Sequence, residues 1–160
     1  MTFDAARRST FDGREAELER IGAREVAFLA QTSIRSRTPE TLGLPREPNT
    51  WTALGEGEAL WLGPDEWLLI GGTPPMSADP IVDVSANRAI LDLEGETRHA
   101  LLGQGCSLDL HPSRWRGGMC AQTLLGGVPV ILQERDGATR VLVRPSFANH
   151  LVGWLASLTT

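Results

Sequence analysis

Polar and apolar positions alternate through much of the chain, which is the pattern of strands with one buried face. The even-numbered positions from Val26 to Ile34 carry Val, Phe, Ala, Thr and Ile. This period of two predicts a first strand over residues 26–34.

Two apolar runs, residues 59–62 and 67–70, are separated by Gly63-Pro64-Asp65-Glu66. Proline and aspartate in a short break between apolar runs predict a β-hairpin. Because both runs are apolar on both faces, the hairpin is expected to lie centrally and to be covered from two sides.

The second half of the chain predicts more strands. Residues 81–93 fit a strand pair or one bent strand. Further strands are predicted over the ranges 119–125, 128–132 and 139–143, with turns at Gly126-Gly127 and Asp136-Gly137. Pro129 is expected to confine its strand to an edge or a bulge, because proline cannot donate a ladder hydrogen bond.

Two segments predict helices. Residues 96–102 fit a short helix, with Gly103 as a left-handed C-cap. Ser146 is a suitable N-cap for a closing helix. Its predicted buried face is formed by residues at helical spacing, namely Phe147, Leu151, Trp154, Leu155 and Leu158.

These elements predict an α+β fold with helices packed on a mainly antiparallel sheet. Residues 1–23 are polar and charged and are expected to form an arm or a short exposed helix. Residues 24–160 then form one domain with two similar halves, about 24–72 and 81–158, each resembling a ferredoxin-like split βαβ unit.

Composition excludes several function classes. All 15 basic residues are arginine, so lysine Schiff-base chemistry and a P-loop lysine are excluded. A net charge of -5 with scattered arginines argues against nucleic acid or an anionic membrane as the main partner. Two cysteines and no long apolar run predict a cytoplasmic protein with reduced thiols.

No motif assembles a catalytic, cofactor or metal site. Gly55-Glu56-Gly57 and Gly103-Gln104-Gly105 lack the third glycine of a dinucleotide fingerprint and are interpreted as turns. Cys106, Asp109 and His111 are the residue types of a cysteine nucleophile, but such triads usually draw on distant segments. Adding His99 and Cys120 gives no zinc-type spacing.

Trp115 stands out among the five tryptophans because it lies between Arg114 and Arg116 in a predicted loop. Tryptophan and arginine are enriched at interface hot spots. We therefore predict that Arg114, Trp115 and Arg116 contact another protein subunit.

Five stretches of the sequence resemble the sarcosine oxidase gamma subunit family. They occur in the family's order, and the resemblance extends over roughly residues 24–158. These stretches are Ala59–Leu69 (ALWLGPDEWLL), Val82–Ser85 (VDVS), Cys106–Pro112 (CSLDLHP), Met119–Thr123 (MCAQT) leading to Val128-Pro129-Val130, and Leu142–Ala148 (LVRPSFA) running into Trp154-Leu155.

The resemblance implies a non-catalytic assembly subunit of a heterotetramer that oxidises sarcosine to glycine. Its partners would be the alpha, beta and delta subunits. The other subunits would hold FAD, FMN and NAD and would use tetrahydrofolate. The family is also distantly similar to the folate-binding domain of aminomethyltransferases, in which the strand after a glycine turn supplies a catalytic carboxylate. The matching stretch here, Gly126–Ile131, contains no acid.

Two alternatives follow from the same kinship. One is a folate-binding aminomethyltransferase-like protein. The other is an iron–sulfur repair factor with a functional Cys120, which is disfavoured because Gly117-Gly118-Met119-Cys120 lacks the lysine and tyrosine of that branch's motif.

Overall fold

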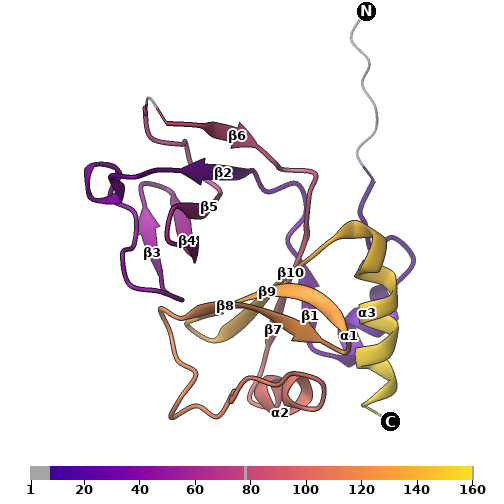
Figure 1. The fold of residues 1–160 in the computed structure, drawn as a ribbon. Coiled ribbons are helices and arrows are strands. Elements are labelled where there is room, and N and C mark those ends of the chain that lie inside the picture. Colours follow the sequence, from indigo (N-terminus) through magenta and orange to yellow (C-terminus); the bar gives the residue numbers. More distant parts are fainter. Residues whose placement is uncertain (1–7, 78, 160) are drawn as a thin grey trace, which may run out of the picture.

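A computed structural model of the chain describes residues 8–77 and 79–159, and the strands in this part of the chain form two antiparallel sheets (Figure 1). Sheet A has the strand order β1 (Ala23–Glu25), β7 (Ala89–Glu94), β10 (Ala138–Val143), β9 (Val128–Arg135), β8 (Cys120–Leu125). Sheet B has the order β3 (Trp51–Leu54), β4 (Gly57–Gly63), β5 (Glu66–Ile70), β2 (Gln31–Arg35), β6 (Ile81–Asp83). The helical elements are α1 (Glu15–Arg20), a 3₁₀ turn (Pro39–Leu42), α2 (Arg98–Gly103) and α3 (Pro145–Ser157). The predicted α+β class with mainly antiparallel sheets is confirmed.

The strand predicted over residues 26–34 is instead two strands in different sheets. β1 pairs with β7 in sheet A, and β2 pairs with β5 in sheet B. Between them Phe28 has a φ of 60°. A residue in this left-handed region cannot continue an extended strand, so the chain leaves one sheet here and enters the other.

The chain crosses between the sheets a second time after β6. β6 pairs with β2 in sheet B, whereas β7 pairs with β1 and β10 in sheet A. The two predicted halves therefore exchange a strand: β1 from the first half completes sheet A, and β6 from the second completes sheet B. Neither half contains a complete sheet.

The predicted hairpin is confirmed as β4 and β5, which pair with Leu60 opposite Leu68. One face of the hairpin packs into a core cluster shared with sheet A. Its other face packs with Ile34 and Leu44 in a separate cluster. The hairpin is thus covered from both sides, as its doubly apolar sequence predicts.

Pro129 lies in β9, an inner strand between β10 and β8, so the predicted edge position is wrong. The reason is local. β10 pairs with β9 only as far as Val143 opposite Val130, so at Pro129 the one neighbour in the ladder is Leu124 of β8. A missing N–H is tolerated where one side of the strand has no partner.

The closing helix is confirmed, but its start differs from the prediction. Arg144 is the extended N-cap and Pro145 occupies the first turn, where proline's missing N–H costs nothing. Leu151 and Leu155 are buried, whereas Phe147 is 41% exposed and Ala148 is buried in its place. The predicted buried face is therefore wrong at Phe147.

The short helix is confirmed as α2, but Gly103 lies inside it and Gln104 caps it in a right-handed conformation. The predicted left-handed glycine cap is wrong. The backbone N–H of Gln104 instead bonds to the carbonyl of Leu101, which closes the last turn without a left-handed residue.

The segment predicted as a polar arm contributes side chains to the core, beginning with Phe11. Phe11, Leu18 and Ile21 are buried, and α1 lies against α3. The prediction missed this because the three apolar side chains are spaced widely among charged residues. Residues 1–7 lie outside the described part of the chain.

Candidate functional site

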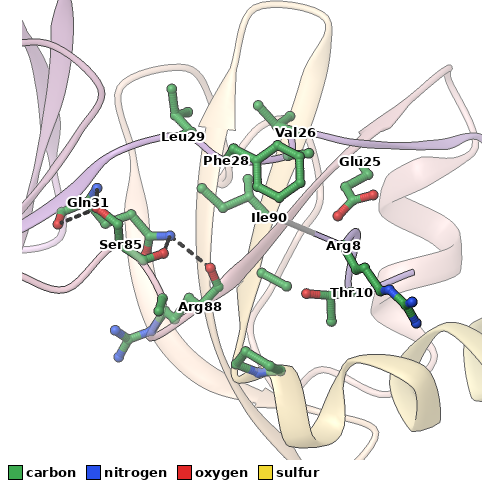
Figure 2. A pocket seen from close by; sticks show the side chains of 14 residues that line it. Arg8, Thr10, Glu25, Val26, Phe28, Leu29, Gln31, Ser85, Arg88 and Ile90 are labelled. Atoms are coloured by element: carbon green, nitrogen blue, oxygen red, sulfur yellow. Dashed lines mark hydrogen bonds between the residues drawn. The ribbon is translucent and has the colours of Figure 1, made fainter. Parts of the chain in front are cut away.

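A pocket of about 330 Å³ lies where the chain crosses between the two sheets (Figure 2). Its walls come from both crossing segments and from the residues that lead into α1 and α3. The lining residues are Arg8, Thr10, Glu25, Val26, Ala27, Phe28, Leu29, Gln31, Ser85, Ala86, Arg88, Ala89, Ile90 and Pro145.

Gln31 fixes the two crossing segments to each other. Its Nε2 donates to the carbonyl oxygen of Arg88 at 2.8 Å and to that of Ser85 at 3.3 Å. Its backbone N–H donates to Ser85 Oγ at 3.0 Å. The Gln31 Oε1 atom is buried and accepts no hydrogen bond from the described residues. Gln31 therefore acts as a structural clamp at one end of the pocket.

The mouth of the pocket is apolar on one side and charged on the other. The Phe28 ring is 56% exposed and lies beside Val26 and Ile90 (Figure 2). On the charged side, the Glu25 carboxylate accepts a hydrogen bond from Ser9 Oγ. The volume is at the lower end for small-molecule sites, and an apolar wall with a polar rim also suits contact with a protein partner.

The cysteine triad considered from the sequence is not assembled. Cys106 Sγ lies 3.8 Å from Thr123 Oγ1. The His111 Nδ1 atom instead pairs with Ser113 Oγ at 2.8 Å, and Asp109 accepts the backbone N–H of His111 at 3.0 Å. These are local turn contacts. Within residues 8–77 and 79–159, no group of three or more metal-ligand side chains converges.

Cys120 is fully buried, and its Sγ lies 3.3 Å from the Thr50 carbonyl and 3.6 Å from the Trp61 carbonyl. Burial raises the pKa of the Cys120 thiol to about 12. Because the thiolate is the reactive form, this cysteine is held unreactive near neutral pH. The geometry gives no support to a repair factor that works through Cys120.

Trp115 does not lie at the surface, although the sequence suggested an interface anchor. Its side chain is 4% exposed, and its Nε1 donates to Glu134 Oε2 at 2.7 Å. In this position it packs the chain's own core and offers a partner no accessible ring. Arg114 and Arg116 are exposed beside it, and subunit contact through these two arginines stays a prediction.

The Glu134 carboxylate is the centre of a buried polar cluster. It also accepts hydrogen bonds from Arg98 Nη2 at 2.8 Å and from Thr139 Oγ1, and it lies 3.0 Å from His99 Nε2. A buried carboxylate with this many donors is satisfied in place. It is held for structure and has no free oxygen to act as a general base.

A second cluster of largely buried ion pairs was not predicted from the sequence. Asp92 pairs with Arg140 at 2.7 Å, and Glu58 pairs with Arg135 at 2.9 Å and with Arg140 at 3.2 Å. Glu58 belongs to sheet B and the other three residues to sheet A. The sequence signal that could have revealed this cluster is a charged residue within each of two otherwise apolar strands. Asp92 of β7 and Arg140 of β10 lie directly opposite each other in the sheet.

Comparisons with known proteins point to one family. The profile of the sarcosine oxidase gamma subunit family matches residues 76–160. The chain is 34% identical over 158 residues to sarcosine oxidase subunit gamma of Corynebacterium sp. strain U-96, covering 84% of this chain and 77% of that protein. It is 32% identical over 164 residues to the same subunit from an Arthrobacter species, covering 86% and 79%.

The chain belongs to the sarcosine oxidase gamma subunit family. The family predicted from its five sequence stretches is thereby confirmed. The fold of this gamma-subunit family member also matches a chain in the heterotetrameric sarcosine oxidase of Corynebacterium sp. U-96, solved with pyrrole 2-carboxylate. That match has a TM-score of 0.83 at 29% identity and covers 96% of this chain and 94% of the other.

Proposed function

We propose that this chain is a non-catalytic assembly subunit of a heterotetrameric sarcosine oxidase, a complex that oxidatively demethylates sarcosine to glycine. The observation that carries the proposal is the fold match over 96% of the chain to a subunit of such a heterotetramer. The match covers nearly the whole chain and is therefore a match of the entire domain.

The arrangement of the reactive side chains supports a role without chemistry. Glu134, Asp92 and Glu58 are engaged by arginines, and the Cys120 thiol is enclosed with a raised pKa. General acid–base or nucleophilic catalysis needs a group that is free to accept a proton or to attack. On this proposal the alpha, beta and delta subunits are the partners. The FAD, FMN, NAD and tetrahydrofolate of the reaction belong to them.

A cytoplasmic location is part of the proposal. Cys106 and Cys120 are both free thiols, which suits a reducing compartment. Within the described residues, no helix is long and apolar enough to cross a membrane.

Co-expression with the three larger subunits tests the proposal. We expect the chain to co-elute with them in equal amounts on a sizing column, and sarcosine turnover per bound flavin to be unchanged by Cys106→Ser in this chain. Elution of the wild-type chain apart from the other subunits would contradict the assembly role. A large loss of turnover in an intact complex would contradict the non-catalytic role.

The alternative of a folate-binding aminomethyltransferase-like protein places its ligand in the pocket at the sheet crossing. Calorimetry of the isolated chain with tetrahydrofolate separates the two functions. Saturable micromolar binding that is lost on Gln31→Ala would favour the alternative, and no heat beyond dilution is expected for an assembly subunit.

A further inference from the structure

Arg88 is a partly buried cation without an ion-pair partner. Buried and half-buried arginines elsewhere, such as Arg98, Arg135 and Arg140, each pair with a carboxylate. Among the described residues, no carboxylate oxygen lies within ion-pairing distance of the Arg88 guanidinium and no acceptor hydrogen-bonds to it. A partly desolvated charge without a counter-ion costs some stability, which makes Arg88 a candidate for contact with an acidic group outside this chain.

A second arginine increases this cost. Burial lowers the pKa of Arg88, the charge of Arg144 lowers it further, and Glu66 opposes both effects. Glu66 is itself engaged by Arg35 at 3.1 Å. Arg144 is exposed, and within the described part of the chain its side chain donates to a neutral acceptor, Asn87 Oδ1, at 2.8 Å. The two guanidinium groups therefore share a region of positive potential that Glu66, which also pairs with Arg35, offsets only in part.

Both arginines line an open groove of about 530 Å³ on the face of sheet A formed by β8 and β9. Ser107 and Thr123 also line the groove, and Leu124 contributes an apolar side chain that is 54% exposed. Gln122 Nε2 donates to the Leu62 carbonyl at 2.8 Å, which ties this wall to sheet B. In Figure 2 the Arg88 side chain points away from Phe28, so its charge is directed away from the apolar mouth of the first pocket.

We propose that the Arg88–Arg144 groove receives an aspartate or glutamate side chain from a partner subunit of the oxidase, with Leu124 packing beside it. The inference rests on the proposed function and adds the chemistry of one contact. Two guanidinium groups offer several N–H donors to the lone pairs of a carboxylate. Because the groove is open, with an exposed leucine at its rim, it suits a segment of protein. Small-molecule sites enclose most of their ligand.

The test compares Arg88→Gln, Arg144→Gln and Arg88→Glu with the matched control Arg46→Gln, an exposed arginine in the loop before β3. Each chain is co-expressed with the larger subunits. The complex is washed on a column with sodium chloride rising from about 0.15 M to about 1 M, which shortens the Debye length from about 8 to about 3 Å. We expect about tenfold or greater weakening for Arg88→Gln and complete loss of this chain for Arg88→Glu. Arg46→Gln is expected to match the wild type.

Thermal unfolding of the isolated chains separates loss of contact from loss of fold. Because Arg88→Gln removes an unpaired charge beside Arg144, its melting temperature is expected to equal or exceed that of the wild type. Failure of the wild-type chain to assemble would overturn the proposed function. If the wild-type chain assembled and the Arg88→Glu chain stayed in the complex at the same salt, only the proposed carboxylate contact in the groove would be overturned.

A small-anion site is the competing outcome. If inorganic phosphate bound the isolated wild-type chain saturably, if Arg88→Gln abolished that binding, and if the variant complex survived the salt wash, the groove would hold a free anion and the partner-carboxylate proposal would be wrong.

Discussion

Cys120 and Glu134 show two results of burying a polar side chain. The Glu134 carboxylate accepts hydrogen bonds from Trp115, Arg98 and Thr139, so neither of its oxygens is buried without a donor. The Cys120 thiol has only weak carbonyl acceptors, and burial favours its neutral form. Burial therefore holds the carboxylate of Glu134 as a structural acceptor and keeps the thiol of Cys120 unreactive.

Labelling with a thiol reagent at pH 8 tests this reading of Cys120. Cys106 is partly exposed and is expected to react within minutes, whereas Cys120 reacts only after unfolding in urea, because its folded pKa is about 12. Mass spectrometry of quenched samples identifies each adduct, and Cys106→Ser isolates the slow site. Equal rates for the two thiols in the folded chain would contradict the assignment.

The motifs Gly103-Gln104-Gly105 and Gly55-Glu56-Gly57 each contain a glycine that lies close to a neighbouring element of the fold. A Cβ on Gly105 would lie 2.2 Å from the Trp154 ring of α3, and one on Gly126 would lie 2.7 Å from the same ring. In the other motif a Cβ on Gly57 would lie 2.4 Å from the carbonyl oxygen of Gly71. One glycine of each motif, Gly105 or Gly57, thus allows a close approach between elements, which supports their interpretation as packed turns.

Two alanine substitutions in one motif test this role. Gly105→Ala is expected to lower the free energy of unfolding by about 1–3 kcal/mol through overpacking against Trp154. Gly103→Ala is the matched control, because it lies in α2 with no atom within 4 Å of the added Cβ. It is expected to raise stability by up to about 1 kcal/mol through helix propensity. Urea unfolding measures both, and equal effects would argue against the contact with Trp154.

At the scale of the whole molecule, the two sheets are joined by an apolar layer and by an ionic contact. The apolar layer contains Leu60 and Leu68 from sheet B and Ile131 and Leu142 from sheet A. Glu58 adds the ionic contact by pairing with arginines of sheet A. Because strands are also exchanged between the halves, we infer that the sheets fold and unfold together.

Glu58→Gln tests the ionic contact between the sheets. The change removes a charge that faces two arginines, and it is expected to lower the free energy of unfolding by about 1–3 kcal/mol. Glu56→Gln, exposed in the preceding turn, is the control and should lie within about 0.5 kcal/mol of the wild type. Fluorescence and circular dichroism should give one coincident transition for all three chains. Two separate transitions would show that the sheets unfold independently.

The sequence by itself predicted what depends on local periodicity. The hairpin β4–β5, the strands β8 to β10 and the helix α3 follow from apolar spacing and turn residues that act over a few positions. The family also followed from short stretches of sequence, several of which lie in these elements. The errors at Phe147 and Gly103 concern the ends of helices. Phe147 lies in the first turn of α3 and is partly exposed, and Gly103 lies inside α2 and is not its cap.

Only the tertiary structure decided which sheet each strand joins and which charges meet. A period of two does not show that Phe28 turns the chain from sheet A to sheet B, because alternation continues across the break. Trp115 resembled a surface anchor because its neighbours are arginines, yet its partner is Glu134, nineteen residues away in sequence. The pocket at the crossing and the unpaired Arg88 arise in the same way. Each depends on segments far apart in the chain, whose meeting is set by the packing of the whole core and not by local pattern.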